Sequence, residues 1–265
     1  MKLGFIGCGN MATAIIKGII NSNKVNCRDI FVYDISDEAT NKIANNFEIT
    51  VCNTQNEIVN KCDVVVLAVK PNILSNVLNN INLALAEKET LLISIAAGKS
   101  IEFIRSNLSH NNKIIRVMPN INAVVNEAIS AYCTSKNITQ DDKNIAELIL
   151  SSIGQVINLD EAYFPLFSVL GGCSPAMVYM FIDSLARAGV KNGMKKDMAL
   201  KVAAQAVYGS AKMIMESPEH PWELIDRVCS PGGTTIEAVT SLQNSCFESS
   251  IINAVDKAVE KDSKL

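Results

Sequence analysis

The first 160 residues alternate short, uniformly apolar runs with longer segments whose apolar residues recur at helical spacing. The run 64–69 is apolar throughout, as expected of a strand covered on both faces of a sheet. Apolar residues at 12, 15, 16, 19 and 20 form one face of a helix. This alternation predicts a parallel sheet with crossover helices. The expected strands are 3–6, 30–33, 49–52, 64–69, 91–95, 114–117, 129–133 and 155–159, and the helices between them include 38–45, 73–80, 101–108 and 139–153.

The pattern changes after Asp160, beyond which the strand-like runs stop and only helices are expected. Ser174 followed by Pro175 predicts a helix start, because serine caps helices and proline suits their first position. That helix is expected to end near Asn192. We therefore expect one domain at 1–160 and a second, all-helical domain at 161–265.

The segment 197–216 is expected to be a helix that is apolar nearly all round. Such a helix needs burial on every side, and a domain of about 100 residues seldom supplies that alone. We therefore expect a homodimer through the second domain. A monomeric helical bundle is the alternative.

Composition favours a small-molecule partner. The net charge is −3 and no run of lysine or arginine forms a basic patch, so nucleic acid is not expected. Eight cysteines without a C-x-x-C pair indicate a reduced, cytoplasmic protein without a disulfide framework or metal site. Charges or turn residues interrupt each apolar run before the roughly 18 residues of a membrane helix, so no membrane association is expected.

Gly7 and Gly9 lie between the first expected strand and the first helix. With Ala12 they fit G-x-G-x-x-G/A, in which the glycines allow a tight turn and a close approach of the backbone to pyrophosphate. The helix that follows would direct its free N–H groups at phosphate. We therefore expect a Rossmann-like, mostly parallel α/β domain that binds a dinucleotide. A tight turn without any ligand is the alternative.

Asp34 ends the second expected strand, about 20 residues beyond Ala12, where an acidic residue contacts the ribose 2′-hydroxyl. This favours NAD over NADP. Asp34 could equally cap a turn with Ser36.

Other strand ends should line the same crevice, since ligands of such sheets bind at the carboxyl ends of the strands. Lys70 and Pro71 follow the fourth strand, and Lys70 is placed for a cofactor phosphate or ribose. A solvated lysine is the alternative. Ala97 and Asn120 follow the next two strands along the chain.

A second glycine turn, Cys-Ser-Pro-Gly-Gly-Thr-Thr at 229–235, opens an expected helix in the second domain. Successive backbone N–H groups can converge there on an anion such as a carboxylate, and the two threonine hydroxyls add donors. A helix cap without a ligand is the alternative.

These motifs together resemble the pyrroline-5-carboxylate reductase family, and the resemblance extends almost from end to end. It rests on Phe-Ile-Gly-Cys-Gly-Asn-Met-Ala at 5–12, Leu-Ala-Val-Lys-Pro at 67–71, Ser-Ile-Ala-Ala-Gly at 94–98, Arg-Val-Met-Pro-Asn at 116–120, Ser-Pro-Ala at 174–176, Gln-Ala-Val-Tyr-Gly at 205–209 and Val-Cys-Ser-Pro-Gly-Gly-Thr-Thr-Ile at 228–236.

The resemblance implies reduction of 1-pyrroline-5-carboxylate to L-proline by NADPH or NADH, the last step of proline biosynthesis. It also implies an N-terminal Rossmann domain and a helical dimerisation domain, often in a ring of dimers. The expected cofactor-binding residues are Ile6, Gly7, Cys8, Gly9, Asn10, Met11, Ala12, Asp34, Ala68, Val69, Lys70, Pro71, Ala97 and Asn120. The expected substrate-binding residues are Ser230, Gly232, Gly233, Thr234 and Thr235, of which Thr235 is also the expected catalytic residue.

Little acid–base machinery is needed, because hydride addition to an imine depends chiefly on positioning the reactants. By resemblance, the Thr235 hydroxyl hydrogen-bonds the imine nitrogen and the turn around it holds the carboxylate. Two segments depart from the family pattern. Ile121-Asn122 stands where Thr-Pro is common, and Gly171-Gly172-Cys173 stands where Ser-Gly-Ser is common.

Two other functions are possible on the same plan. β-Hydroxyacid dehydrogenases carry a catalytic lysine in a G-x-x-x-K pattern, but Pro175 and Ala176 occupy the matching positions here. A dinucleotide-binding regulator without catalysis is the other alternative, and the intact turn at 229–235 argues against it.

Overall fold

The structure is a computed structural model that describes residues 1–262. It divides into two compact units, Met1–Gly172 and a second unit that begins at Cys173. The division lies later than the expected one after residue 160. The intervening segment remains with the first unit because Phe164 and Phe167 pack into a small core with Ala131.

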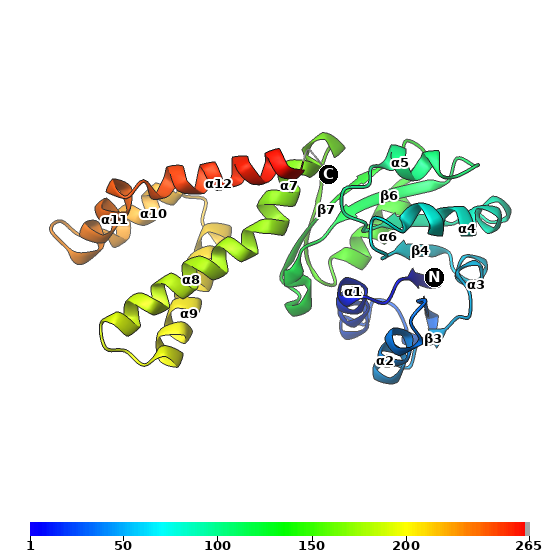
Figure 1. The fold of residues 1–265 in the computed structure, drawn as a ribbon, viewed down its shortest axis with the longest axis horizontal. Helices are drawn as coiled ribbons and strands as arrows, with labels where there is room; N and C mark the ends of the chain where they lie inside the picture. Colours follow the sequence, from blue (N-terminus) through cyan, green and yellow to red (C-terminus); the bar gives the residue numbers. More distant parts are fainter. Residues whose placement is uncertain (263–265) are drawn as a thin grey trace. The chain divides into compact units, whose positions relative to one another are not determined.

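Eight strands form a single sheet within residues 1–262, in the order β3-β2-β1-β4-β5-β6-β7-β8 (Figure 1). Every neighbouring pair is parallel except β6 and β7. Only the short 3-10 helix Ile121–Val125 lies between those two, which is too short for a parallel crossover. The mostly parallel α/β fold is thus confirmed. The strands are β1 Leu3–Ile6, β2 Ile30–Tyr33, β3 Thr50–Val51, β4 Val64–Leu67, β5 Leu91–Ser94, β6 Lys113–Met118, β7 Ala128–Thr134 and β8 Gly154–Asn158.

Helices cover both faces of the sheet, and strand residues alternate between the two cores. Leu3 and Phe5 of β1 pack on the side of α1, α2 and α6, whereas Ile6 packs on the side of α3, α4 and α5. Gly4 also faces α3, where a Cβ would lie 2.5 Å from Cγ2 of Ile58. The helices are α1 Asn10–Asn21, α2 Asp37–Phe47, α3 Gln55–Lys61, α4 Leu74–Glu87, α5 Ile101–Ser106 and α6 Gln140–Leu150.

Several thiols and one phenol are buried in the first unit. Burial, with a smaller effect of nearby charge, raises the pKa of Cys8, Cys62 and Cys133 to about 12 and that of Cys52 to about 11. Burial and a hydrogen bond of 2.5 Å from its hydroxyl to Oε1 of Glu147 raise the pKa of Tyr132 to about 12. These groups therefore stay protonated in the folded chain at pH values where the unfolded chain would lose their protons.

We expect the free energy of unfolding to fall as the pH rises from about 9 to about 12. Each group that ionises only in the unfolded chain lowers this free energy by up to about 1.4 kcal/mol per pH unit. Urea unfolding at pH 8 and pH 10 measures the difference. Cys133→Ala removes one of these groups, so the free energy of unfolding should fall less with pH, by the contribution of one proton. Equal free energies of unfolding at the two pH values would contradict the prediction.

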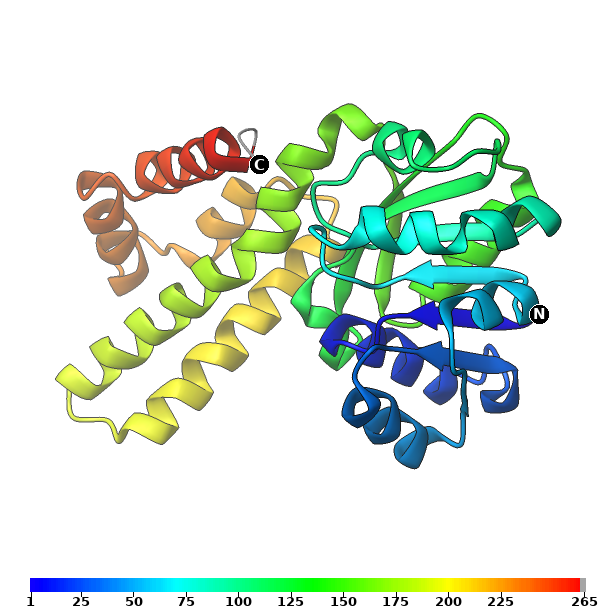
Figure 2. The same cartoon turned by 45° about the vertical axis from the view of Figure 1, so that its right-hand side comes forward.

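The second unit is built on a helical hairpin, α8 (Ser174–Lys191) and α9 (Lys196–Glu216), which lie side by side in Figure 2. The loop between them starts with a Schellman cap. Gly193 has a φ of 93°, and the Met194 N–H donates to the Gly189 carbonyl at 3.0 Å. The remaining helices are α10 Pro221–Val228, α11 Thr234–Asn244 and α12 Phe247–Asp262.

Small residues let the two helices of the hairpin approach closely. Ala186, Ala199 and Ala203 form its buried cluster. A Cβ on Gly189 would lie 3.0 Å from the Cβ of Ala199, so a larger side chain would force the helices apart. The hairpin is therefore a tightly packed pair.

One continuous helical run, Glu161–Lys191, is long and apolar enough to cross a membrane by length and composition, and 22% of its most apolar window is buried. The expectation that turn residues interrupt every apolar run is therefore wrong here. Gly171 and Gly172 lie in a π-helical turn, and Pro175 is in the first turn of α8, where an absent N–H costs little. The α-helix α8 begins at Ser174 as expected, but the helical run extends upstream of it through the π-helical turn Ser168–Cys173.

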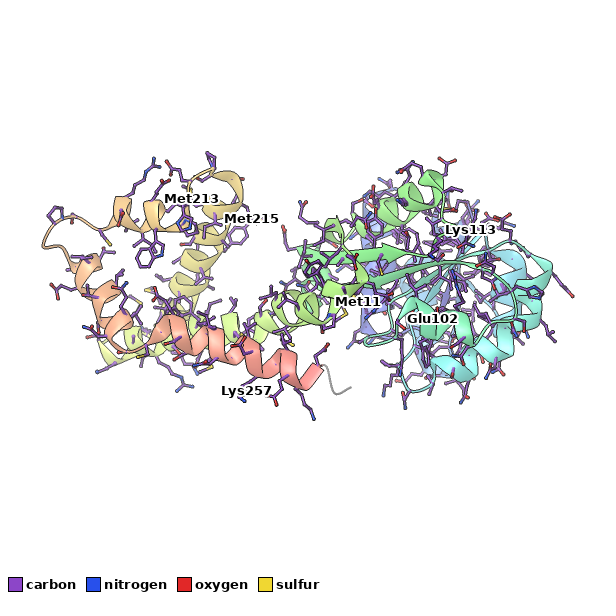
Figure 3. The ribbon with its side chains drawn as sticks, turned by 90° about the horizontal axis from the view of Figure 1, so that it is seen from above. Met11, Glu102, Lys113, Met213, Met215 and Lys257 are labelled. Atoms are coloured by element: carbon purple, nitrogen blue, oxygen red, sulfur yellow. The ribbon has the colours of Figure 1, made fainter. Side chains whose placement is uncertain are left out.

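The expected burial of α9 on every side is not provided by its own chain. Its buried residues are Ala199 and Ala203. Met213 and Met215, labelled in Figure 3, are 54% and 73% exposed. The apolar surface of this helix is thus free to contact another subunit.

Candidate active site

The turn between β1 and α1 requires glycine at position 7. Gly7 has a φ of 104°, and its N–H donates to the Tyr33 carbonyl at 2.8 Å. A Cβ at this position would lie 2.5 Å from the backbone oxygen of Ala68. The turn therefore brings together three strand ends, those of β1, β2 and β4, without room for a side chain.

Gly9 serves a different purpose, because a Cβ there would meet nothing within 4 Å. It is the N-cap of α1, and its own side of the turn is open. No acidic residue lies in the first turn of α1, and no side chain caps it. The first N–H groups of a helix lack partners within the helix, so this end is suited to a phosphate. Ala12 is buried one turn later.

Asp34 ties the glycine turn to the end of β2. Its Oδ2 accepts a hydrogen bond of 2.7 Å from the Cys8 N–H, and its Oδ1 accepts one of 2.9 Å from the Ser36 N–H. The turn with Ser36, one of the two alternatives for Asp34, is thus present. It does not prevent the other, because each carboxylate oxygen keeps a second lone pair for a ribose hydroxyl.

The other expected cofactor residues follow strands that are in register with β1. Ile6 pairs with Leu67, which pairs with Ser94. Ala68, Val69, Lys70 and Pro71 therefore leave the sheet beside the glycine turn, and Ala97 leaves it one strand further along. The N–H of Ala68 donates to the Ile6 carbonyl at 2.8 Å, and the side chain of Lys70 is exposed.

Asn120, which follows β6, is 5% exposed. Its Nδ2 donates to the Gly171 carbonyl at 2.9 Å, while its Oδ1 is buried without a partner among residues 1–262. This bond joins the residue just before Ile121-Asn122 to the backbone of Gly171, so the two segments that depart from the family pattern lie near each other. A Cβ on Gly171 would lie 3.1 Å from Cζ of Phe167, so a side chain at this position would crowd the Phe167 ring.

The turn at 229–235 is built from the second unit alone. Gly232 has a φ of 66°, and the Gly233 N–H donates to the Ser230 carbonyl at 3.0 Å. A Cβ on Gly233 would lie 2.4 Å from Oγ of Ser230. Thr234 and Thr235 begin the 11-residue helix α11, which has no side-chain cap; Thr234 is exposed and Thr235 is half-buried. Free N–H groups and hydroxyls thus share one turn.

Two of these contacts were not predicted from the sequence, the bond from Cys8 to Asp34 and the bond from Asn120 to Gly171. The partners are 26 and 51 residues apart, and no local pattern specifies such pairs. Within the described residues no group of three or more His, Cys, Asp or Glu side chains could hold a metal ion.

Two family models match the chain. One, described as pyrroline-5-carboxylate reductase dimerisation, matches residues 161–265, and another, described as NADP oxidoreductase coenzyme F420-dependent, matches residues 2–98. The pyrroline-5-carboxylate reductase of Escherichia coli K12 is 41% identical over 264 residues, which cover 100% of this chain and 98% of that protein.

Solved structures agree with this similarity. The crystal structure of Plasmodium falciparum pyrroline carboxylate reductase with NADP bound is 36% identical, with a TM-score of 0.87, over 99% of this chain and 97% of that one. A pyrroline-5-carboxylate reductase from Coxiella burnetii is 30% identical, with a TM-score of 0.93, over the same shares of the two chains.

Proposed function

The chain belongs to the pyrroline-5-carboxylate reductase family, and from that premise we propose which of its residues perform the reaction. The reaction is reduction of the cyclic imine 1-pyrroline-5-carboxylate to L-proline by NAD(P)H, the last step of proline biosynthesis. The observation that carries the assignment of residues is the turn at 229–235, where a helix N-terminus and two threonine hydroxyls meet.

The first unit holds the cofactor. NAD(P)H supplies the hydride when bound. The open space at Gly9, together with the free N–H groups of α1, suits the pyrophosphate. Asp34 accepts a hydrogen bond from a ribose hydroxyl, and Lys70 neutralises part of the negative charge of a phosphate. The fixed amide of Asn120 keeps an unpaired Oδ1 available to an N–H donor.

The second unit holds the substrate. The N–H groups of Thr234 and Thr235 have no acceptor within α11, and the Ser230 hydroxyl lies close to Gly233, the residue just before them. A carboxylate at this position gains both hydrogen bonds and the positive end of the helix dipole. The substrate carboxylate is therefore held here.

Thr235 acts on the imine nitrogen. Once the carboxylate is fixed, the neighbouring hydroxyl of Thr235 can hydrogen-bond the nitrogen and orient the imine. The hydride then adds to the imine carbon while the nitrogen holds or gains the proton that completes the amine. Positioning of this kind lowers the barrier by removing rotational freedom of the reactants. Neither His110 nor His220 is needed. The Nδ1 of His220 instead accepts the Trp222 N–H at 3.3 Å as part of the cap of α10.

The proposed activity is tested by following oxidation of NADH and NADPH with 1-pyrroline-5-carboxylate, beside a 3-hydroxy acid with NAD⁺. We expect turnover with the imine only. Turnover of the hydroxy acid alone would indicate a β-hydroxyacid dehydrogenase, and cofactor binding without any turnover would indicate a regulator.

We expect the protein to be a dimer or a multiple of a dimer. The second unit matches a dimerisation domain, and α9 exposes the apolar side chains of Val202, Tyr208 and Met213. Leaving such a surface in water is unfavourable by about 25 cal/mol per Å². Light scattering at micromolar concentration measures the mass. A monodisperse monomer would contradict the prediction.

Burial against another subunit also accounts for the apolar run Glu161–Lys191 without a membrane, since the whole run lies in the matched dimerisation segment 161–265. We also propose a cytoplasmic location. All eight cysteines are free in the described part of the chain, which is the usage of a reducing compartment.

A further inference from the structure

The carboxyl end of β2 carries negative charge and no cation. Asp34 is followed by Ile35, which is 92% exposed, and then by Asp37 and Glu38 in the first turn of α2. The sequence contains no lysine or arginine between Asp34 and Lys42. In dinucleotide sites of this fold, a nearby arginine accommodates the 2′-phosphate of NADP, and this strand end provides none.

The neighbouring strand supplies no cation either. Val51 of β3 pairs with Val32 of β2, so β3 ends at the same edge of the sheet. The residues that follow it are Cys52, Asn53 and Thr54, all uncharged in the folded chain. The N–H of Asn53 is already bonded to a carboxylate, Oε2 of Glu57, at 2.7 Å. The lysine near this edge, Lys61, is already paired with Oε1 of the same Glu57 at 2.5 Å. A phosphate here would therefore meet acids and, among the residues described at this edge, no base that is not already engaged.

Asp34 is also held in place. Each of its two oxygens accepts a backbone N–H, from Cys8 at 2.7 Å and from Ser36 at 2.9 Å. Because those donors belong to the glycine turn and to the N-cap of α2, the carboxylate cannot rotate away without breaking both bonds. A ribose 2′-hydroxyl can donate to a remaining lone pair, whereas a 2′-phosphate meets a fixed negative charge at contact distance.

We propose that this chain selects NADH over NADPH, and that Asp34 is the residue that determines the choice. Asp37 and Glu38 add repulsion at longer range. The inference deepens the proposed function, on which it rests, because membership of the family leaves the choice of cofactor open. It follows from two observations: the Asp34 carboxylate is held by two backbone hydrogen bonds, and no lysine or arginine lies between residues 34 and 42.

The ratio of kcat/KM for NADH to that for NADPH tests the proposal. We expect the natural chain to favour NADH by at least about tenfold, and Asp34→Ser to move the ratio toward NADPH by about tenfold. The double variant Asp37→Asn, Glu38→Gln should move it by about two- to threefold, since exposed charges further from the phosphate are screened. Asp29→Asn is the matched control. It removes one negative charge next to the opposite end of β2, so the ratio should not change.

Dissociation constants of both cofactors, measured by fluorescence titration without substrate, separate this inference from the proposed function. Selective binding of NADH without imine reduction would retain the inference and overturn the function. Imine reduction with equal or better use of NADPH would retain the function and overturn the inference. An unchanged ratio in Asp34→Ser, or an equal shift in Asp29→Asn, would also overturn the inference. Asp34→Asn keeps one acceptor oxygen and serves as the second variant if the serine variant does not fold.

Discussion

Replacing Thr235 with alanine is expected to lower kcat and kcat/KM together, by roughly 10- to 150-fold. The hydroxyl would orient the imine nitrogen as its charge changes, so the interaction is stronger in the transition state than in the bound substrate. Loss of one such hydrogen bond corresponds to about 1.5–3 kcal/mol. Steady-state kinetics with saturating cofactor measures the change.

Thr234→Ala is the matched control for this prediction. Thr234 is exposed, and its loss leaves the backbone donors of α11 in place, so we expect a smaller effect, mainly on KM. NADH affinity should be unchanged in both variants. If Thr234→Ala loses kcat and Thr235→Ala keeps it, the two roles are reversed. If neither variant is impaired, the turn is only a helix cap.

Alanine at Gly9 is expected to weaken NADH binding by about 5- to 150-fold while leaving the fold intact. The methyl group would meet nothing in the free protein, and the φ of −72° suits alanine. It would instead occupy the space where the pyrophosphate approaches, and overpacking of this kind costs about 1–3 kcal/mol. Fluorescence titration gives the affinity. The free energy of unfolding, measured in urea, should change by less than about 1 kcal/mol.

Gly7→Ala provides the contrasting result two residues away. Its φ of 104° and the 2.5 Å approach to the Ala68 oxygen make any Cβ unfavourable in the folded chain itself. We expect the free energy of unfolding to fall by roughly 2–5 kcal/mol. Unchanged NADH affinity in Gly9→Ala would show that the turn does not approach the cofactor as described. Unchanged stability in Gly7→Ala would show that the turn does not pack against Ala68 as described.

The sequence was informative wherever one short segment sufficed. The uniformly apolar run 64–69 predicted a strand covered on both faces, of which the structure forms Val64–Leu67. The glycines at 7 and 9 predicted the turn. Both predictions succeeded because periodicity and backbone freedom are local properties. The expectation that turn residues interrupt every apolar run failed at Gly171 and Gly172, whereas Pro175 lies in the first turn of α8 as predicted. Turn-forming residues end a helix only when the surrounding structure does not stabilise it, and here a π-helical turn and a first-turn position accommodate them.

Contacts between residues far apart in the chain could not be predicted from the sequence, for a different reason. The bond between the Cys8 N–H and Asp34 depends on the pairing of β1 with β2, and the sequence predicted both strands without their side-by-side geometry. The exposure of α9 in a single chain, in contrast, was expected, because a domain of about 100 residues seldom buries a helix that is apolar nearly all round. Its composition indicated burial, which a single chain does not provide, so the pattern described an assembly rather than a monomer.

The exposed apolar side chains of α8 and α9 make the stability of the fold a function of protein concentration. A second unit whose core within the chain is three alanines has little to hold it when its partner dissociates. Dilution should then act as a denaturant, because each dissociated hairpin loses the surface that keeps it folded. The midpoint of thermal unfolding would rise with the amount of enzyme, and activity per chain would fall at low copy number even with abundant substrate.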